Sequence, residues 1–139
     1  MQASTSEEYG VAKRRRYAKR IGTQMWESQL RKGSLMLAVL ATLRHERLYG
    51  SEIRRRLEQL AGLTVSDSVI YPLLRRLQKT DFLETERIEP AVGQSKRYFA
   101  LSRSGHEYLS ELSNIWKEFA DGMDRVLATS HRTHPQSAA

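Results

Sequence analysis

Basic and hydroxyl-bearing side chains recur at helical spacing in the stretch SDSVIYPLLRRLQKTDFLE, which runs from Ser66 to Glu84. At 100° per residue, four apolar residues share one face of the expected helix, and polar residues occupy the other. The apolar residues are Ile70, Leu73, Leu74 and Leu77. The other face carries Ser68, Pro72, Arg75 and Lys79, flanked by Tyr71 and Arg76. Arginine can bind a guanine edge through two hydrogen bonds, whereas lysine and the tyrosine hydroxyl suit phosphate oxygens. The pattern predicts a helix that packs on a core and offers its polar face to nucleic acid.

Pro72 lies inside this run, although proline removes a backbone donor and crowds the preceding turn of a helix. It falls on the polar face, so the carbonyl of Ser68 that loses its partner points toward water or a groove, where the loss costs less than in a dry core. The residue before proline is biased away from helical angles, so we expect Tyr71 in a distorted first turn. Two alternatives stay open: a merely solvated basic face, and a Tyr71 ring that packs against its own domain.

Composition limits the classes of protein to consider. The chain has 139 residues, 40% of them apolar and 28% charged, which fits one soluble domain with polar extensions. It has no cysteine, so disulfide and thiol chemistry are excluded. The longest apolar run, Leu35–Leu43, is too short to span a bilayer, and no signal-peptide stretch precedes it. We therefore expect a cytoplasmic protein without a membrane partner.

The net charge of +7 favours polyanionic partners. The segment KRRRYAKR holds six basic residues and no acidic one: Lys13, Arg14, Arg15, Arg16, Lys19 and Arg20. Such an arm can lie along a DNA backbone or in a minor groove. A solvated tail is the alternative interpretation.

The remaining periodicities predict a mostly α fold with a small β-hairpin. Residues 1–32 form a basic extension, disordered to about Tyr9, with a weak helix from Lys13 to Leu30. Residues 33–101 form one domain, and residues 102–129 a long helix that begins after a Ser102 cap and is followed by a disordered tail at 130–139.

Inside residues 33–101 the order is helix, helix, helix, hairpin. A buried helix is expected at Gly33–Glu46, and LYG (48–50) reads as a turn. The next helix should begin at a Ser51 cap, stop at Gly62, and bury Ile53, Leu57, Leu60 and Ala61. After the basic helix, two strands are predicted at Phe82–Ile88 and Lys96–Leu101.

Three segments in this order resemble the PadR family of bacterial transcriptional repressors: LYGSEIRRRLEQ, VIYPLLRRLQKTDFL and GQSKRYFALSRSG. The resemblance extends from about Leu35 to Leu127 and implies a winged helix-turn-helix fold that binds double-stranded DNA. Ser68 stands where the family usually has glycine, Val69 where it often has threonine, and Asp81 where glycine normally ends the recognition helix. The operator sequence therefore cannot be copied from relatives, and Asp81 is expected to adopt a left-handed backbone conformation.

The resemblance also implies DNA contacts by Tyr71 and by the wing. Gly93 and Gln94 would form the tip of this wing, with Lys96 and Arg97 at its root. The expected DNA-binding set is thus Ser68, Tyr71, Arg75, Arg76, Lys79, Lys96 and Arg97.

The C-terminal helix carries apolar residues spaced alternately by three and four: Leu109, Leu112, Trp116, Phe119, Met123 and Val126. Such a heptad pattern requires a partner helix, and a homodimer supplies it, as the resemblance also implies. Folding back onto its own domain is the alternative. A twofold dimer predicts a palindromic site with half-sites about 10 bp apart or more. In some PadR relatives, aromatic residues between the dimer helices bind flat effector molecules, so Trp116 is a candidate effector contact as well as a packing residue.

Nothing in the sequence indicates catalysis, a metal site or a cofactor. His45, His106, His131 and His134 have no ligand spacing with other donors, and no phosphate loop or nucleophile elbow is present. We expect a homodimeric repressor that blocks polymerase access and is released when an effector alters the spacing of its recognition helices. A basic protein that coats DNA without sequence choice and a winged-helix protein-interaction module remain alternatives.

Overall fold

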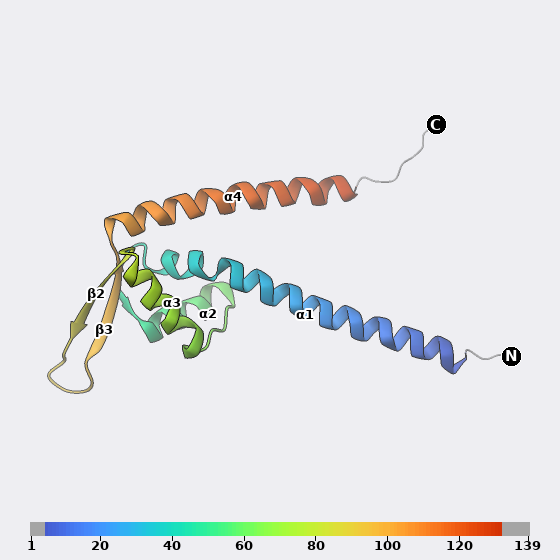
Figure 1. The fold of residues 1–139 in the computed structure, drawn as a ribbon, viewed down its shortest axis with the longest axis horizontal. Coiled ribbons are helices and arrows are strands. Elements are labelled where there is room, and N and C mark those ends of the chain that lie inside the picture. The colour runs from blue at the N-terminus through green and yellow to red at the C-terminus, as the bar shows by residue number, and fades with distance from the viewer. Residues whose placement is uncertain (1–4, 132–139) are drawn as a thin grey trace. The chain divides into compact units, whose positions relative to one another are not determined.

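The computed structural model describes residues 5–131, and Figure 1 shows its helices and strands. In chain order they are α1 (Ser6–Thr42), β1 (Leu48–Tyr49), α2 (Gly50–Ala61), α3 (Asp67–Lys79), β2 (Leu83–Ile88), β3 (Lys96–Leu101) and α4 (Arg103–His131). The chain divides into two compact units, residues 1–36 and residues 37–139. The predicted fold class, mostly helical with a small sheet, is confirmed. The predicted disordered tail at 130–139 begins inside α4 and, beyond residue 131, lies outside the described residues.

The first unit is one helix, the part of α1 from Ser6 to Met36. The prediction of a helix only from Lys13, after disordered residues, was wrong. The helix starts where the Oγ1 of Thr5 accepts a hydrogen bond from the Glu8 N–H at 3.1 Å. No helix break occurs near residue 32, because strong helix formers such as lysine, arginine, leucine and methionine outweigh three interior glycines that each cost about 1 kcal/mol.

The second unit contains the hydrophobic core. Every described hydrophobic residue that is buried belongs to it: Val39, Leu40, Leu43, Leu48, Ile53, Leu57, Ile70, Leu73, Leu74, Leu77, Leu83, Phe99, Leu101 and Leu109. These residues come from the end of α1, one face each of α2 and α3, the sheet and the first turns of α4. Helix α3 therefore packs against the core through its own apolar face.

Helix α2 ends as predicted but begins differently. Gly62 adopts the left-handed conformation with φ 64°, and its N–H donates to the carbonyl of Glu58 at 3.0 Å. The N-cap is Tyr49 rather than Ser51, and the Tyr49 N–H donates to the Glu52 carboxylate at 3.2 Å. Burial of Leu60 and Ala61 was predicted wrongly. All residues from 58 to 62 are exposed, so the last turn of α2 lies outside the packed region.

The sheet has three antiparallel strands in the order β1-β3-β2. The predicted hairpin is confirmed, with Leu83 opposite Leu101 and Ile88 opposite Lys96. The strand β1 was missed and was expected as a turn, because two residues are too short to show an alternating pattern. Its pairing of Tyr49 with Tyr98 fixes the start of α2 against the wing.

Two backbone carbonyls join the end of α3 to the start of α4. Asp81 has the predicted positive φ, 65°, and its carbonyl accepts hydrogen bonds from the hydroxyls of Ser102 at 2.6 Å and Ser104 at 3.1 Å. The Phe82 carbonyl accepts the Ser102 N–H at 3.1 Å. The Ser102 Oγ in turn accepts the Gly105 N–H at 3.0 Å, which confirms Ser102 as the cap of α4.

Close packing accompanies these hydrogen bonds. The rings of Phe82 and Tyr108 stack with centroids 4.2 Å apart. A Cβ atom on Gly105 would lie 2.0 Å from the Phe82 carbonyl oxygen, a distance no side chain tolerates. Only glycine fits at this position, and the first turns of α4, which include the buried Leu109, are fixed to the core.

The variant Gly105→Ala tests the corner between α3 and α4, where Asp81 and Phe82 contact residues 102–105. Because the added methyl group forces α4 away from Phe82, we expect the free energy of unfolding to fall by about 1–3 kcal/mol in chemical denaturation. Gly122→Ala is the matched control in the same helix, since its Cβ would lie 3.6 Å from the flexible end of Arg125. The control should be neutral or stabilising by up to about 1 kcal/mol. Equal effects of the two substitutions would contradict the close approach.

Candidate nucleic-acid interface

Helix α3 has the two faces that the sequence predicts. Ile70, Leu73, Leu74 and Leu77 are at most 6% exposed and pack into the core. The opposite side is exposed and carries Ser68, Pro72, Arg75, Arg76 and Lys79. The exposed side therefore presents three cations and a hydroxyl on one rigid element.

The helix continues through Pro72. Its first turn is closed by the Ser66 carbonyl, which accepts the N–H groups of Val69 at 3.1 Å and Ile70 at 3.0 Å. Pro72 itself is exposed, so its missing N–H lies away from the core, as predicted from the helical wheel. The proline thus leaves the apolar face intact.

An exposed ion pair connects α3 to α2. Arg54 of α2 pairs with Asp67, the first residue of α3. A carboxylate at this end also interacts favourably with the helix dipole. The pair contributes at most about 1 kcal/mol because both side chains are exposed, and its main effect is on the orientation of the helix start.

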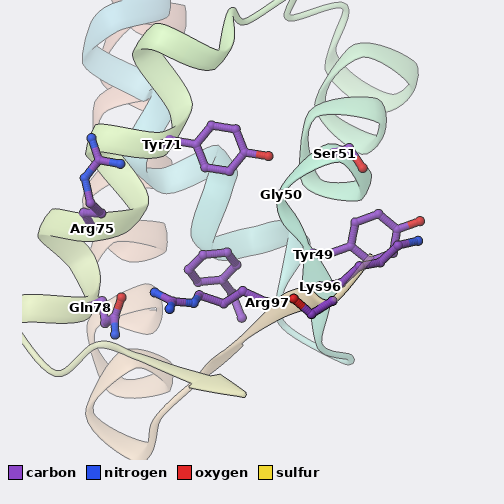
Figure 2. A pocket seen from close by; sticks show the side chains of 10 residues that line it. Tyr49, Gly50, Ser51, Tyr71, Arg75, Gln78, Lys96 and Arg97 are labelled. Carbon is purple, nitrogen blue, oxygen red and sulfur yellow. The ribbon is translucent and has the colours of Figure 1, made fainter. Parts of the chain in front are cut away.

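A groove of about 420 Å³ separates α3 from the wing (Figure 2). The start of α2 forms its third wall. Ten residues line it: Tyr49, Gly50, Ser51, Tyr71, Arg75, Gln78, Ser95, Lys96, Arg97 and Phe99. The groove therefore combines donors from three elements that are far apart in the sequence.

The Tyr71 ring lies against the first residue of α2 (Figure 2). A Cβ atom on Gly50 would be 2.6 Å from the Tyr71 hydroxyl oxygen and 2.7 Å from the nearest ring carbon. Of the two interpretations of Tyr71, packing against its own domain is what the structure shows, and the ring also lines the groove. The contact explains the glycine of the LYG segment, since a side chain there would collide with the Tyr71 ring where it now lies.

The two basic residues of β3 are held differently. Arg97 extends toward α3, whereas Lys96 lies beside Tyr49 (Figure 2). The Lys96 ammonium is 4.2 Å from the centroid of the Tyr49 ring, a cation–π distance. Tyr49 also packs edge to face with Tyr98 at 5.4 Å. An aromatic pair thus fixes Lys96 at the edge of the groove.

Four of the predicted site residues, Tyr71, Arg75, Lys96 and Arg97, line this one groove. Ser68, Arg76 and Lys79 lie on the exposed face of α3 outside it. Sequence reasoning missed the remaining polar lining residues, Tyr49, Ser51, Gln78 and Ser95. Gln78 follows Tyr71 by seven residues, or two helical turns, and so lies on the same side of α3. This spacing could have identified Gln78 from the sequence.

Some cations of the second unit are paired and others are not. Arg47, Arg54 and Arg56 form ion pairs with Glu86, Asp67 and Glu46. Within residues 5–131, no carboxylate lies at ion-pair distance from the cations of α3 and the wing, which are Arg75, Arg76, Lys79, Arg87, Lys96 and Arg97. Three of these, Arg75, Lys96 and Arg97, line the groove from both sides.

The part of the chain that the structure describes brings together no group of three or more histidine, aspartate or glutamate side chains fit to hold a metal ion. None of the helices in residues 5–131 has the length and hydropathy needed to cross a membrane.

The fold and this surface define a winged helix-turn-helix protein, with α3 as recognition helix and β2–β3 as wing. Residues 39–111, more than half of the chain, match the model of the transcriptional regulator PadR-like family. The chain belongs to this family. Its members are transcriptional regulators, so the chain is a DNA-binding regulator and not an enzyme.

Several solved structures are similar to this chain. A PadR-like transcription factor from Bacteroides fragilis is 35% identical with a TM-score of 0.62, and the alignment covers 72% of this chain and 96% of that one. A PadR family regulator from Eggerthella lenta is 27% identical with a TM-score of 0.69, covering 81% and 96%. A PadR-like regulator from Bacillus cereus is 29% identical with a TM-score of 0.65, covering 71% and 96%. A curated relative from Lysinibacillus sphaericus, described as uncharacterized, is 24% identical over 102 residues.

The contact between Gly50 and Tyr71 is tested by a double-mutant cycle. Gly50→Ala should lower the free energy of unfolding by about 1–3 kcal/mol, because its methyl group collides with the ring. In a Tyr71→Ala background the same change should cost little, which gives a coupling energy of about 1 kcal/mol or more by chemical denaturation. Gly33→Ala, whose Cβ would meet nothing within 4 Å, is the control. Additive effects of Gly50→Ala and Tyr71→Ala would contradict the contact.

Proposed function

We propose that this regulator is a repressor that binds a palindromic promoter site as a homodimer, through the exposed face of α3 and the wing. One observation carries the proposal: α3 and the wing carry six cations, and none of them has a carboxylate partner in the described chain. A duplex placed across α3 and the wing provides the missing anions.

The proposed roles follow from side-chain chemistry. Arg75 and Arg76 read base edges in the major groove, where arginine forms bidentate hydrogen bonds with guanine, and Ser68 at the start of α3 contributes a hydroxyl. Lys79, Lys96 and Arg97 bind phosphates and so fix the register of the helix. The Tyr71 ring contacts α2 and lines the groove, and its hydroxyl would donate a hydrogen bond to the DNA phosphate backbone.

The homodimer is proposed from the apolar strip on α4. Trp116, Phe119, Met123 and Val126 follow the heptad spacing and are 41–60% exposed. Ile115 and Leu127 are exposed beside them. Exposed apolar area of this extent, on one face of a long helix, is typical of an interface. Within the predicted interface set, Leu109 belongs to the chain's own core and Leu112 is half-buried, so the proposed contact begins beyond the first turns of α4.

Such a dimer links DNA binding to regulation. A twofold axis through α4 relates two recognition helices and demands a palindromic site, with half-sites about 10 bp apart or a multiple of it. The occupied site blocks polymerase. An effector bound beside Trp116 would change how the α4 helices pack and, through the corner at Asp81 and Phe82, the spacing of the α3 helices.

A second candidate, a protein that coats DNA without sequence choice, is favoured by the exposed run Lys13–Arg20. Competition between promoter and shuffled DNA separates the two. A specific regulator prefers its own site by about a thousandfold or more.

The double variant Arg75→Ala/Arg76→Ala tests the proposed readout. Removing each bidentate arginine–guanine pair should cost about 1–3 kcal/mol of promoter affinity, so the preference for promoter over shuffled DNA should collapse in a competition binding assay. Arg55→Ala/Arg56→Ala removes the same charge from α2, at the exposed Arg55 and at the half-buried Arg56 that pairs with Glu46, and should leave the preference unchanged. If the α3 variant retains promoter DNA as well as this control does, the proposal is wrong.

Phe119→Glu tests the dimer. A carboxylate in the α4 interface is buried without a partner, so the particle mass measured by light scattering should fall to that of one chain, and promoter affinity should fall with it. Asn114→Glu adds the same charge on the opposite, polar side of α4 and should stay dimeric. Equal masses for the two variants would contradict the α4 interface.

A further inference from the structure

The first unit precedes the family match, which begins at Val39. Two of the solved relatives cover 71–72% of this chain. The third covers 81%, which is more than residues 37–139 alone, so that similarity extends into the helix of residues 6–36. Its chemistry has to be explained from its own residues.

This helix carries a dense cluster of charge. Six cations lie between residues 13 and 20, and no acidic residue occurs between Glu8 and Glu27. All six are exposed, and none forms an ion pair in the part of the chain that the structure describes. Eight helical residues span about 12 Å, so the cluster approaches the charge spacing of duplex DNA, one phosphate per about 1.7 Å of axis.

The helical conformation decides between the two binding modes predicted for this arm. An α-helix with its side chains is about 10–12 Å across, whereas the minor groove is about 6 Å wide. Insertion into the minor groove, one of the two predicted modes, would require the helix to unfold. The structure favours the other mode, contact with the phosphate backbone.

The arrangement of the charges favours DNA over a lipid surface. A helix that lies on a membrane needs a continuous apolar face. At 100° per residue, Arg14 falls between Ile21 and Met25 and interrupts the apolar strip. The other five cations share the opposite side of the helix, which can therefore meet phosphates.

We propose that the helix of residues 6–36 is a sequence-independent phosphate-binding element, and that Lys13, Arg14, Arg15, Arg16, Lys19 and Arg20 are its contacts. The proposal rests on the proposed function only in that DNA is the partner. The element raises affinity for any duplex and adds to the salt dependence of binding, while the choice of sequence stays with α3.

The test measures the salt dependence of DNA binding by the full-length protein. Arg15→Gln/Arg16→Gln should reduce the slope of log affinity against log salt by about 0.9 for each phosphate that the variant no longer neutralises. Affinity for the promoter and for a shuffled duplex of the same length should fall by the same factor, so the preference between them stays constant. Glutamine keeps the helix, because its helix propensity is close to that of arginine, and circular dichroism verifies this.

Arg31→Gln/Lys32→Gln is the matched control. It removes two charges from the same helix, one of which is already paired with Glu27 at 3.1 Å. The control should leave the slope near that of the parent protein. Equal slopes for the test and control variants would overturn the proposal. So would a test variant that loses binding to phosphatidylserine vesicles while its DNA slope stays unchanged, which would assign the helix to membranes.

The salt slope is independent of whether the protein is a repressor. A protein that shows no promoter preference, but whose slope falls in Arg15→Gln/Arg16→Gln, would refute the palindromic repressor and support the phosphate-binding helix. A protein whose preference for promoter DNA depends on Arg75 and Arg76, but whose salt slope does not change in Arg15→Gln/Arg16→Gln, would support the proposed readout by α3. The same result would refute the phosphate-binding helix.

Discussion

The corner between α3 and α4 sets the geometry on which the rest of the second unit depends. The carbonyls of Asp81 and Phe82 accept three hydrogen bonds from the first residues of α4, and the glycine at position 105 lets the two backbones approach. The left-handed backbone at Asp81 turns the chain sharply enough to bring these groups together. The end of α3 and the start of α4, the proposed dimer helix, are thus joined by one backbone and two side-chain hydrogen bonds.

The start of α3 is fixed by two contacts with α2. One is the close approach between Tyr71 and Gly50, and the other is the ion pair of Arg54 with Asp67. Both contacts come from α2, which itself is placed by the pairing of β1 with the wing. The helix is therefore positioned at its start, at its groove-lining side and at its end. Three arginines of this unit, Arg47, Arg54 and Arg56, are paired with carboxylates, whereas the cations of α3 are not.

Much of this arrangement could be predicted because its causes are local. The two faces of α3 follow from helical spacing, the end of α2 from Gly62, and the start of α4 from Ser102. What could not be predicted depends on partners distant in the sequence. Strand β1 exists only because β3 pairs with it, and the groove joins Tyr49 and Gln78 with the wing. The continuity of α1 was missed because the sequence was divided into helices at Lys13–Leu30 and Gly33–Glu46, although helix formers outweigh the glycines inside α1.

The central claim is that two copies of α3, related by a twofold axis, read a palindrome. Hydroxyl-radical footprinting of the full-length protein on the DNA upstream of its own gene tests it most directly. We expect two protected segments of inverted sequence, with centres one helical turn of about 10 bp or a multiple of it apart. Protection that spreads evenly along the fragment as protein is added, or a single segment without dyad symmetry, would contradict it.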